Sequence, residues 1–162
     1  MISMAEALAR IKTRVHPVHA CERLPIRDCL NRVNNEAVKS PRAVPPQPNS
    51  AMDGYAIAIG SLVENGIAEL EPIGSAYAGT PFAGRCGPGQ CVRIMTGALV
   101  PEGTDAVVPQ EQAEVGDDGK IRIDFDHRAG ENIRQAGEDV QKGEVVIDAG
   151  KRLSPADLGV LA

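Results

Sequence analysis

The most informative stretch of this chain, QPNSAMDGYA, occupies residues 47–56. A proline-rich approach over residues 41–48 leads into it, and the apolar run YAIAI follows over residues 55–59. Proline fixes φ and glycine permits positive φ, so backbone chemistry shapes the chain here. Asp53 directly before Gly54 is typical of a turn at a loop-to-strand junction. Read alone, the pattern predicts a turn followed by a short strand.

From residue 36 onward, short β-rich runs alternate with clusters of Gly, Pro and Asp. Residues 117–119, DDG, predict a hairpin turn. Over residues 120–125, apolar and polar side chains alternate, which predicts one buried face and one solvent face. Closely spaced strands without intervening helices favour an antiparallel barrel or sandwich. The predicted strands are Tyr55–Ile59, Glu69–Ala78, Gln90–Met95, Asp105–Pro109, Gln112–Val115, Lys120–Phe125 and Glu144–Ile147.

Helices are predicted at both ends of the chain. Residues 3–16 open on a Ser-x-x-Glu capping box and carry an apolar stripe at helical spacing. Residues 25–35 open on proline, carry a second apolar face and end at two asparagines. Residues 154–162 begin with an N-cap serine and a proline. This last helix stops after about two turns, too short to be stable alone, so we expect a fragment of a longer protein.

Composition limits the function classes. The 162 residues carry a net charge of −5, which argues against non-specific nucleic-acid binding. No run of 18 apolar residues is present and the start lacks a signal-peptide pattern, so we expect no membrane partner and a cytoplasmic location. The four cysteines show neither zinc-type spacing nor disulfide density. His16, His19 and Cys21 crowd together, but a polar connector explains them better than a zinc site.

Three loops place an oxygen-bearing side chain next to a glycine, at residues 53–54, 96–97 and 137–139. If the strand ends converge, these side chains would form a hard oxygen cluster suited to Mg²⁺. Arg93 or Arg134 could then pair with a phosphate or a carboxylate. Each loop can also be an ordinary Asx or Ser/Thr turn without a site, which is the commoner origin of such patterns. The candidate oxygen ligands are Asp53, Thr96, Glu138 and Asp139.

Taken together, the loops resemble a known family, the molybdopterin molybdenumtransferases, which include bacterial MoeA and the gephyrin E domain. The matching segments occur in the family's order and approximate spacing. The closing residues 153–162 resemble the point where the family's chain enters its cofactor-binding α/β domain. The resemblance covers the whole chain, which is well under half of the family's usual length. The matching segments are NSAMDGYA (49–56), VRIMTGA (92–98), PEG (101–103), DAVV (105–108), NIR (132–134) and GED (137–139).

The resemblance implies a function and a set of site residues. Family members insert molybdate into adenylylated molybdopterin with Mg²⁺, release AMP and form molybdenum cofactor. They are homodimers in which the β-rich domain of one subunit faces the pterin-binding domain of the other. A molybdopterin adenylyltransferase is the implied upstream partner. The implied roles are catalysis for Asp53, Thr96 and Asp139, metal binding for Asp53 and Asp139, and substrate binding for Arg134 and Glu138.

The resemblance also implies a division of the chain. Residues 1–20 would be an N-terminal helix that packs on the missing α/β domain. Residues 21–44 with 140–162 would form a small mixed α+β connecting and dimerisation domain, and residues 45–139 the β-rich domain. The expected fold class is therefore mainly β, with an antiparallel barrel-like or sandwich-like domain. We expect the fragment to be inactive alone. The alternative is a non-catalytic dimerisation or scaffold module, because gephyrin relatives show that this architecture can organise partners.

Overall fold

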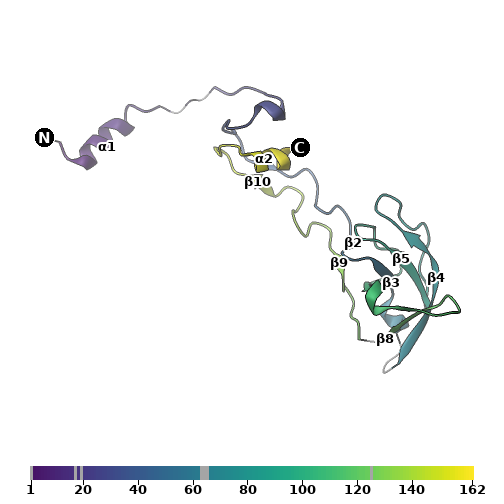
Figure 1. Cartoon of the computed structure of the whole chain (residues 1–162). Coiled ribbons are helices and arrows are strands. Elements are labelled where there is room, and N and C mark those ends of the chain that lie inside the picture. Colours follow the sequence, from purple (N-terminus) through teal and green to yellow (C-terminus); the bar gives the residue numbers. More distant parts are fainter. Residues whose placement is uncertain (1, 17, 19, 63–65, 125) are drawn as a thin grey trace. The chain divides into compact units, whose positions relative to one another are not determined.

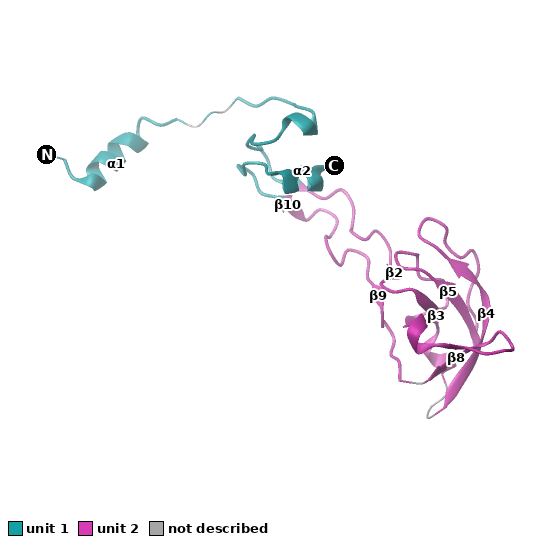
Figure 2. Cartoon of the chain, in the orientation of Figure 1, with its two compact units in different colours: residues 1–38, 147–162 teal, residues 39–146 magenta. Residues whose placement is uncertain are grey.

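The computed structural model describes residues 2–16, 18, 20–62, 66–124 and 126–162. The chain forms two compact units, residues 1–38 with 147–162 and residues 39–146, which Figure 2 distinguishes by colour. The larger unit holds a six-stranded sheet, so the mainly β fold class predicted from the sequence is confirmed. The three-part functional division implied by the family resemblance stays a prediction.

The sheet of the larger unit curls into half of a barrel, with strand order β6-β3-β5-β4-β8-β7 (Figure 1). Neighbouring strands are antiparallel except β4 and β5, which run parallel. The register of that parallel pair shifts between Pro72 and Ser75, an irregularity that bends a sheet. The strands are β3 (Gly54–Ile57), β4 (Ile67–Ala76), β5 (Gln90–Ile94), β6 (Ala106–Pro109), β7 (Glu114–Val115) and β8 (Ile121–Asp124). Phe125, the predicted end of β8, lies outside the described residues.

Apolar side chains cover both faces of the central strands. On β3, Tyr55 and Ile57 belong to one buried cluster and Ala56 belongs to the other. On β5, the neighbours Cys91 and Val92 divide in the same way. Every residue of β3 and β6 is buried. Because packing on two sides restrains these strands, the loops at their ends start from fixed positions.

Shorter elements complete the chain. The β2 strand pairs with β9, and β1 pairs with β10. A single 3₁₀ turn follows β6 directly in the sequence, and another follows β3 after one intervening residue. The short elements are β1 (Val38–Lys39), β2 (Asn49–Ser50), β9 (Ile133–Arg134), β10 (Val145–Ile147), η1 (Ile26–Asp28), η2 (Ile59–Ser61) and η3 (Gln110–Gln112).

Two of the three predicted helices are confirmed in the smaller unit. Helix α1 (Met4–Lys12) begins at Ser3, whose hydroxyl oxygen accepts a hydrogen bond from the Glu6 amide at 3.2 Å. None of its residues is buried. Helix α2 (Pro155–Leu161) begins with a capping box formed by Ser154 and Asp157. Among the described residues, no helix is both long enough and apolar enough to cross a membrane.

The helix predicted over residues 25–35 is wrong, because only the single 3₁₀ turn η1 forms there. Asn31 has a positive φ of 65°, and its amide donates to the Leu153 carbonyl oxygen at 2.9 Å. The Leu153 amide in turn donates to the Arg32 carbonyl oxygen at 2.8 Å. These backbone groups bond to a segment distant in sequence, so they do not form the i to i−4 bonds of a helix.

Candidate functional site

Asp53 and Thr96 lie 43 residues apart in sequence and meet at one end of the sheet. The Thr96 backbone amide donates to Asp53 Oδ1 at 2.7 Å, and the Thr96 hydroxyl donates to the same oxygen at 2.6 Å. Strand pairing explains the meeting, since Gly54 lies opposite Ile94 in the antiparallel pair of β3 and β5. The structure thus brings together the side chains of two predicted motif loops.

Gly54, next to Asp53, lies where β3 and β6 approach too closely for a side chain. A Cβ atom at this position would lie 2.0 Å from the carbonyl oxygen of Val108 on β6. Since that neighbour is backbone, a larger residue would force β3 and β6 apart. Glycine at residue 54 is therefore required by the close approach of β3 and β6, beyond its role in a turn.

The Asp53 carboxyl is held in its ionised form. Hydrogen bonds from the Thr96 side chain and then its backbone lower the pKa of Asp53. Desolvation opposes them in part, and the positive charge of Arg93 adds a smaller lowering of the pKa. At neutral pH the group is a carboxylate. Within the described part of the chain, its side-chain hydrogen bonds all reach Oδ1. Oδ2 is therefore the oxygen that can bind a cation.

Arg93, which the sequence suggested as a partner for phosphate or carboxylate, is engaged inside the unit. Its Nη1 donates to the Gly54 carbonyl oxygen at 2.9 Å, and its Nη2 donates to the side-chain oxygen of Gln110. The guanidinium carbon lies 5.1 Å from the centroid of the Tyr55 ring, a cation–π distance. Arg93 therefore supports the Asp53 loop from β5, through contacts with residues that adjoin this loop.

Gln110 was missed by the sequence reasoning. Its backbone amide donates to the Asp53 carbonyl oxygen at 3.0 Å. The signal that could have found it is strand pairing: Pro109 at the end of β6 lies opposite Gly54 at the start of β3. In an antiparallel pair, the residue after one strand lies beside the residue before its neighbour. Assigning that pair would have placed Gln110 beside Asp53.

The third motif loop forms a separate ion cluster around Arg134. The Nε of Arg134 lies 3.3 Å from Glu138 Oε1, and its Nη2 donates to Asp139 Oδ1. The Gln135 amide also donates to Glu138, at 2.9 Å. These carboxylates raise the pKa of the Arg134 guanidinium, Asp139 first and Glu138 second. The cluster is half exposed, so solvent weakens the ion pairs.

Strand β2 links the loops through its backbone. The Ser50 amide donates to the Ala98 carbonyl oxygen at 2.9 Å, and the Gly97 amide donates to the Ser50 carbonyl oxygen at 2.8 Å. On the other edge, Asn49 lies opposite Arg134. All three loops therefore adjoin β2.

The acidic side chains nevertheless form two clusters and not one. Asp53 contacts Thr96, whereas Glu138 and Asp139 contact Arg134. Within the described ranges, no group of three or more His, Cys, Asp or Glu side chains is arranged to hold a metal ion. His19 of the crowded His16–Cys21 segment lies outside the described residues.

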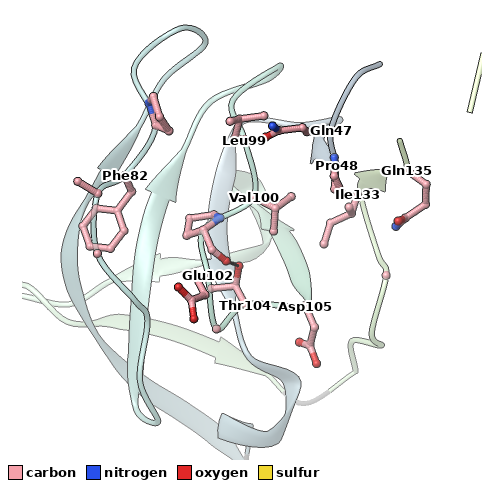
Figure 3. Close-up of a pocket in the computed structure, with 16 residues that line it drawn as sticks. Gln47, Pro48, Phe82, Leu99, Val100, Glu102, Thr104, Asp105, Ile133 and Gln135 are labelled. Atoms are coloured by element: carbon pink, nitrogen blue, oxygen red, sulfur yellow. Dashed lines mark hydrogen bonds between the residues drawn. The ribbon is translucent and has the colours of Figure 1, made fainter. Parts of the chain in front are cut away.

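A cavity of about 650 Å³ lies beside β9 in the same unit. Ile133 and Gln135, the two neighbours of Arg134, line it from one side, and Phe82 lies at the other side (Figure 3). Glu102 and Asp105 give it an acidic rim, although Asp105 Oδ1 already accepts the Ile59 amide at 2.7 Å. None of the five predicted site residues lines this cavity.

Comparison with known proteins shows to which family the chain belongs. The family model for the MoeA N-terminal region (domain I and II) matches residues 2–162. The chain belongs to this family. The resemblance found in the motif loops is thereby confirmed, and it covers almost every residue of the chain.

Individual MoeA relatives agree. The molybdopterin molybdenumtransferase of Haemophilus influenzae is 39% identical over 162 residues, which make up 100% of this chain and 40% of that protein. The Bacillus subtilis protein of the same name is 35% identical over 147 residues, covering 87% of this chain and 34% of its own length. Gephyrin of Dictyostelium discoideum is 30% identical over 156 residues, which are 87% of this chain and 21% of the relative.

A solved structure shows the same fold. The molybdopterin biosynthesis moeA protein of Pyrococcus horikoshii OT3 matches with a TM-score of 0.90 and 32% sequence identity. The match covers 97% of this chain and 42% of that one. The chain therefore spans about 40% of the length of the first MoeA relatives that it matches.

Proposed function

We propose that this chain is the N-terminal part of a transferase that inserts molybdate into adenylylated molybdopterin, releases AMP and forms molybdenum cofactor. Membership of the MoeA family and the names of its relatives support a place in molybdenum cofactor biosynthesis. The observation that carries the proposal is the Asp53–Thr96 pair, in which one carboxylate oxygen is held and the other is available. Two donors orient the group before any substrate arrives.

The donor chemistry of the site fits Mg²⁺. This ion takes oxygen ligands, keeps several waters, and is usually held by one or two carboxylates together with substrate phosphates. Although Asp53 and Asp139 lie in separate clusters in this structure, the proposal assigns both to the ion, which would offset negative charge on the phosphate and on molybdate. Asp139 Oδ1 already accepts a hydrogen bond from Arg134, whereas Asp53 receives its bonds from a neutral residue. Asp53 is therefore the principal ligand in this proposal.

The remaining site residues act on the substrate and on each other. Thr96 orients Asp53 in the catalytic cluster, and Asp139 contributes the second catalytic carboxylate. Arg134 and Glu138 would bind the substrate, with the guanidinium offering donors to phosphate oxygens. The net charge of −5 gives no attraction for an anion from the bulk of the chain. Local groups such as Arg134 must therefore supply it.

The proposed active site is composite. In the homodimer, the pterin-binding domain of the partner subunit would complete the site, and a molybdopterin adenylyltransferase would supply the substrate. The chain covers 40% of the Haemophilus relative, so the proposal assigns the reaction to the complete protein and expects the 162-residue chain to be inactive alone.

The test is the substitution Asp53→Asn in the complete protein. It removes the charge with little change in shape, and AMP release from adenylylated molybdopterin in the presence of molybdate and Mg²⁺ should fall roughly 100-fold or more, as for other losses of charge stabilisation. Asp117→Asn, in the exposed hairpin turn, is the matched control and should keep the wild-type rate. Unchanged AMP release by folded Asp53→Asn would remove Asp53 from the site and favour the non-catalytic scaffold alternative.

A further inference from the structure

The guanidinium of Arg93 contacts Gly54 and Tyr55, which directly follow Asp53, and Gln110 of the η3 turn. Nη1 donates to the Gly54 carbonyl oxygen at 2.9 Å, Nη2 donates to the Gln110 side chain, and the ring of Tyr55 lies below the guanidinium carbon at 5.1 Å. Arg93 itself lies on β5 opposite Tyr55, where two neighbouring strands restrain it. A planar fork with fixed donors suits this bridge, since it reaches two acceptors at once.

Gln110 extends the bridge to Asp53 itself. Its backbone amide donates to the Asp53 carbonyl oxygen at 3.0 Å, while its side chain accepts from Arg93. The two consecutive carbonyl groups of Asp53 and Gly54 are thus held by Gln110 and Arg93. The side chain of Asp53 has a different partner, since Thr96 donates two hydrogen bonds to its carboxylate. The backbone and the side chain of Asp53 are therefore restrained by different parts of the sheet.

We propose that Arg93 is a positioning residue, which holds the Asp53–Gly54 backbone through Gly54 and Gln110 so that the Asp53 carboxylate meets Thr96. The part of this inference that concerns catalysis rests on the proposed function. The geometry favours internal support over anion binding for Arg93, because Nη1 and Nη2 each serve an internal acceptor and the charge lies against an aromatic ring.

The test uses Arg93→Lys and Arg93→Gln. Lysine keeps the charge but is a single donor centre, so both variants should lose the two-acceptor bridge. Arg122→Gln is the matched control, since Arg122 is a half-buried arginine of the same sheet that pairs with Glu69 and Asp118. Should the Arg93 variants fail to fold, Gln110→Ala removes one end of the bridge and leaves its own backbone hydrogen bond in place.

The first readout is amide hydrogen exchange at Thr96 in the 162-residue chain, measured by NMR. If Arg93 holds the Asp53 segment, both Arg93 variants should speed Thr96 exchange about 10-fold or more, because local opening becomes easier. Arg122→Gln should leave that rate unchanged. Gln110→Ala should change it in the same direction as the Arg93 variants. Wild-type exchange at Thr96 in folded Arg93→Lys and Arg93→Gln would overturn the inference.

The second readout is steady-state AMP release by the complete protein. A displaced catalytic group should lower kcat roughly 10-fold to 100-fold while KM changes little, because misplacement affects the reacting geometry. A raised KM with unchanged kcat would mean that Arg93 contacts the substrate, which overturns the inference. Faster Thr96 exchange with normal AMP release would uphold the positioning role of Arg93 and contradict the proposed function of Asp53.

Discussion

Asp53 and Asp157 are each held by the amide and hydroxyl of one neighbouring residue, but the surroundings of their second carboxylate oxygen differ. Thr96 gives its amide and hydroxyl to Asp53 Oδ1, and Ser154 gives its amide and hydroxyl to Asp157 Oδ2. At Asp157 the remaining oxygen accepts the Lys151 ammonium at 2.6 Å, and only 6% of the residue is exposed. Asp53 has no such lysine among its described contacts. Asp157 is therefore a structural cap, whereas Asp53 keeps one oxygen available.

The difference separates a structural carboxylate from a candidate ligand. A carboxylate with both oxygens paired to its own chain has little left to offer a metal ion or a substrate. A carboxylate fixed at one oxygen is oriented and still able to bind. The Arg134 cluster lies between these cases, because Asp139 and Glu138 share one arginine in a half-exposed position.

Alanine substitutions at the glycines near the two aspartates, Gly54 and Gly159, should differ most in their effect on the free energy of unfolding. Gly54→Ala places a Cβ 2.0 Å from backbone, so the free energy of unfolding should fall by about 3 kcal/mol. Gly159 in α2, two residues after Asp157, has nothing within 4 Å of its Cβ position. Gly159→Ala should therefore stabilise the chain, by up to about 1 kcal/mol, through helix propensity. Urea unfolding of both variants measures the difference, and equal effects would contradict the distinction.

Removing the hydroxyl groups of Ser154 and Thr96 should also have different consequences, for stability at one residue and for activity at the other. Ser154→Ala removes an N-cap and should lower the free energy of unfolding by about 1 kcal/mol with no direct effect on chemistry. Thr96→Val should change stability less, yet lower AMP release by the complete protein about 10-fold, because Asp53 loses one orienting hydrogen bond. Unfolding curves and initial rates for both variants test the comparison. A Thr96→Val protein with wild-type activity would refute the role of the pair.

The smallest effect is the pH dependence contributed by Asp157. Hydrogen bonds from Lys151 first and Ser154 second lower its pKa from 3.8 to about 2. A pKa lowered by folding means that the carboxylate stabilises the fold above about pH 4 and that this contribution is lost as pH falls toward 2. The stability advantage of wild type over Asp157→Asn should therefore shrink over that range in urea unfolding. A difference that stays constant with pH would show that the ion pair contributes nothing.

Local patterns predicted what is locally determined. The capping serines at residues 3 and 154 gave the starts of α1 and α2, and alternation over residues 120–125 gave β8. The prediction of a helix over residues 25–35 failed because the backbone there forms hydrogen bonds with residues 151–153, which no local pattern reveals. The parallel pairing of β4 and β5 is a long-range feature of the same kind.

The sequence motifs supplied candidate site residues, but not the arrangement of these residues in the fold. The motif loops identified Asp53 and Thr96, but their contact depends on the register of β3 against β5, which only the fold sets. Sequence also could not show that Arg93 is engaged by Gly54 and Gln110. An arginine near acidic loops fits substrate binding and internal support equally well until its acceptors are known.

The most direct test is a crystal structure of the complete protein with Mg²⁺ and adenylylated molybdopterin. We expect an Mg²⁺ ion about 2.1 Å from the Asp53 oxygen that Thr96 does not contact, with the substrate phosphates as further ligands. Thr96 should keep its two hydrogen bonds to the other oxygen. An Mg²⁺ ion held entirely by other groups, with Asp53 touching neither the ion nor the substrate, would show that Asp53 is not part of the site.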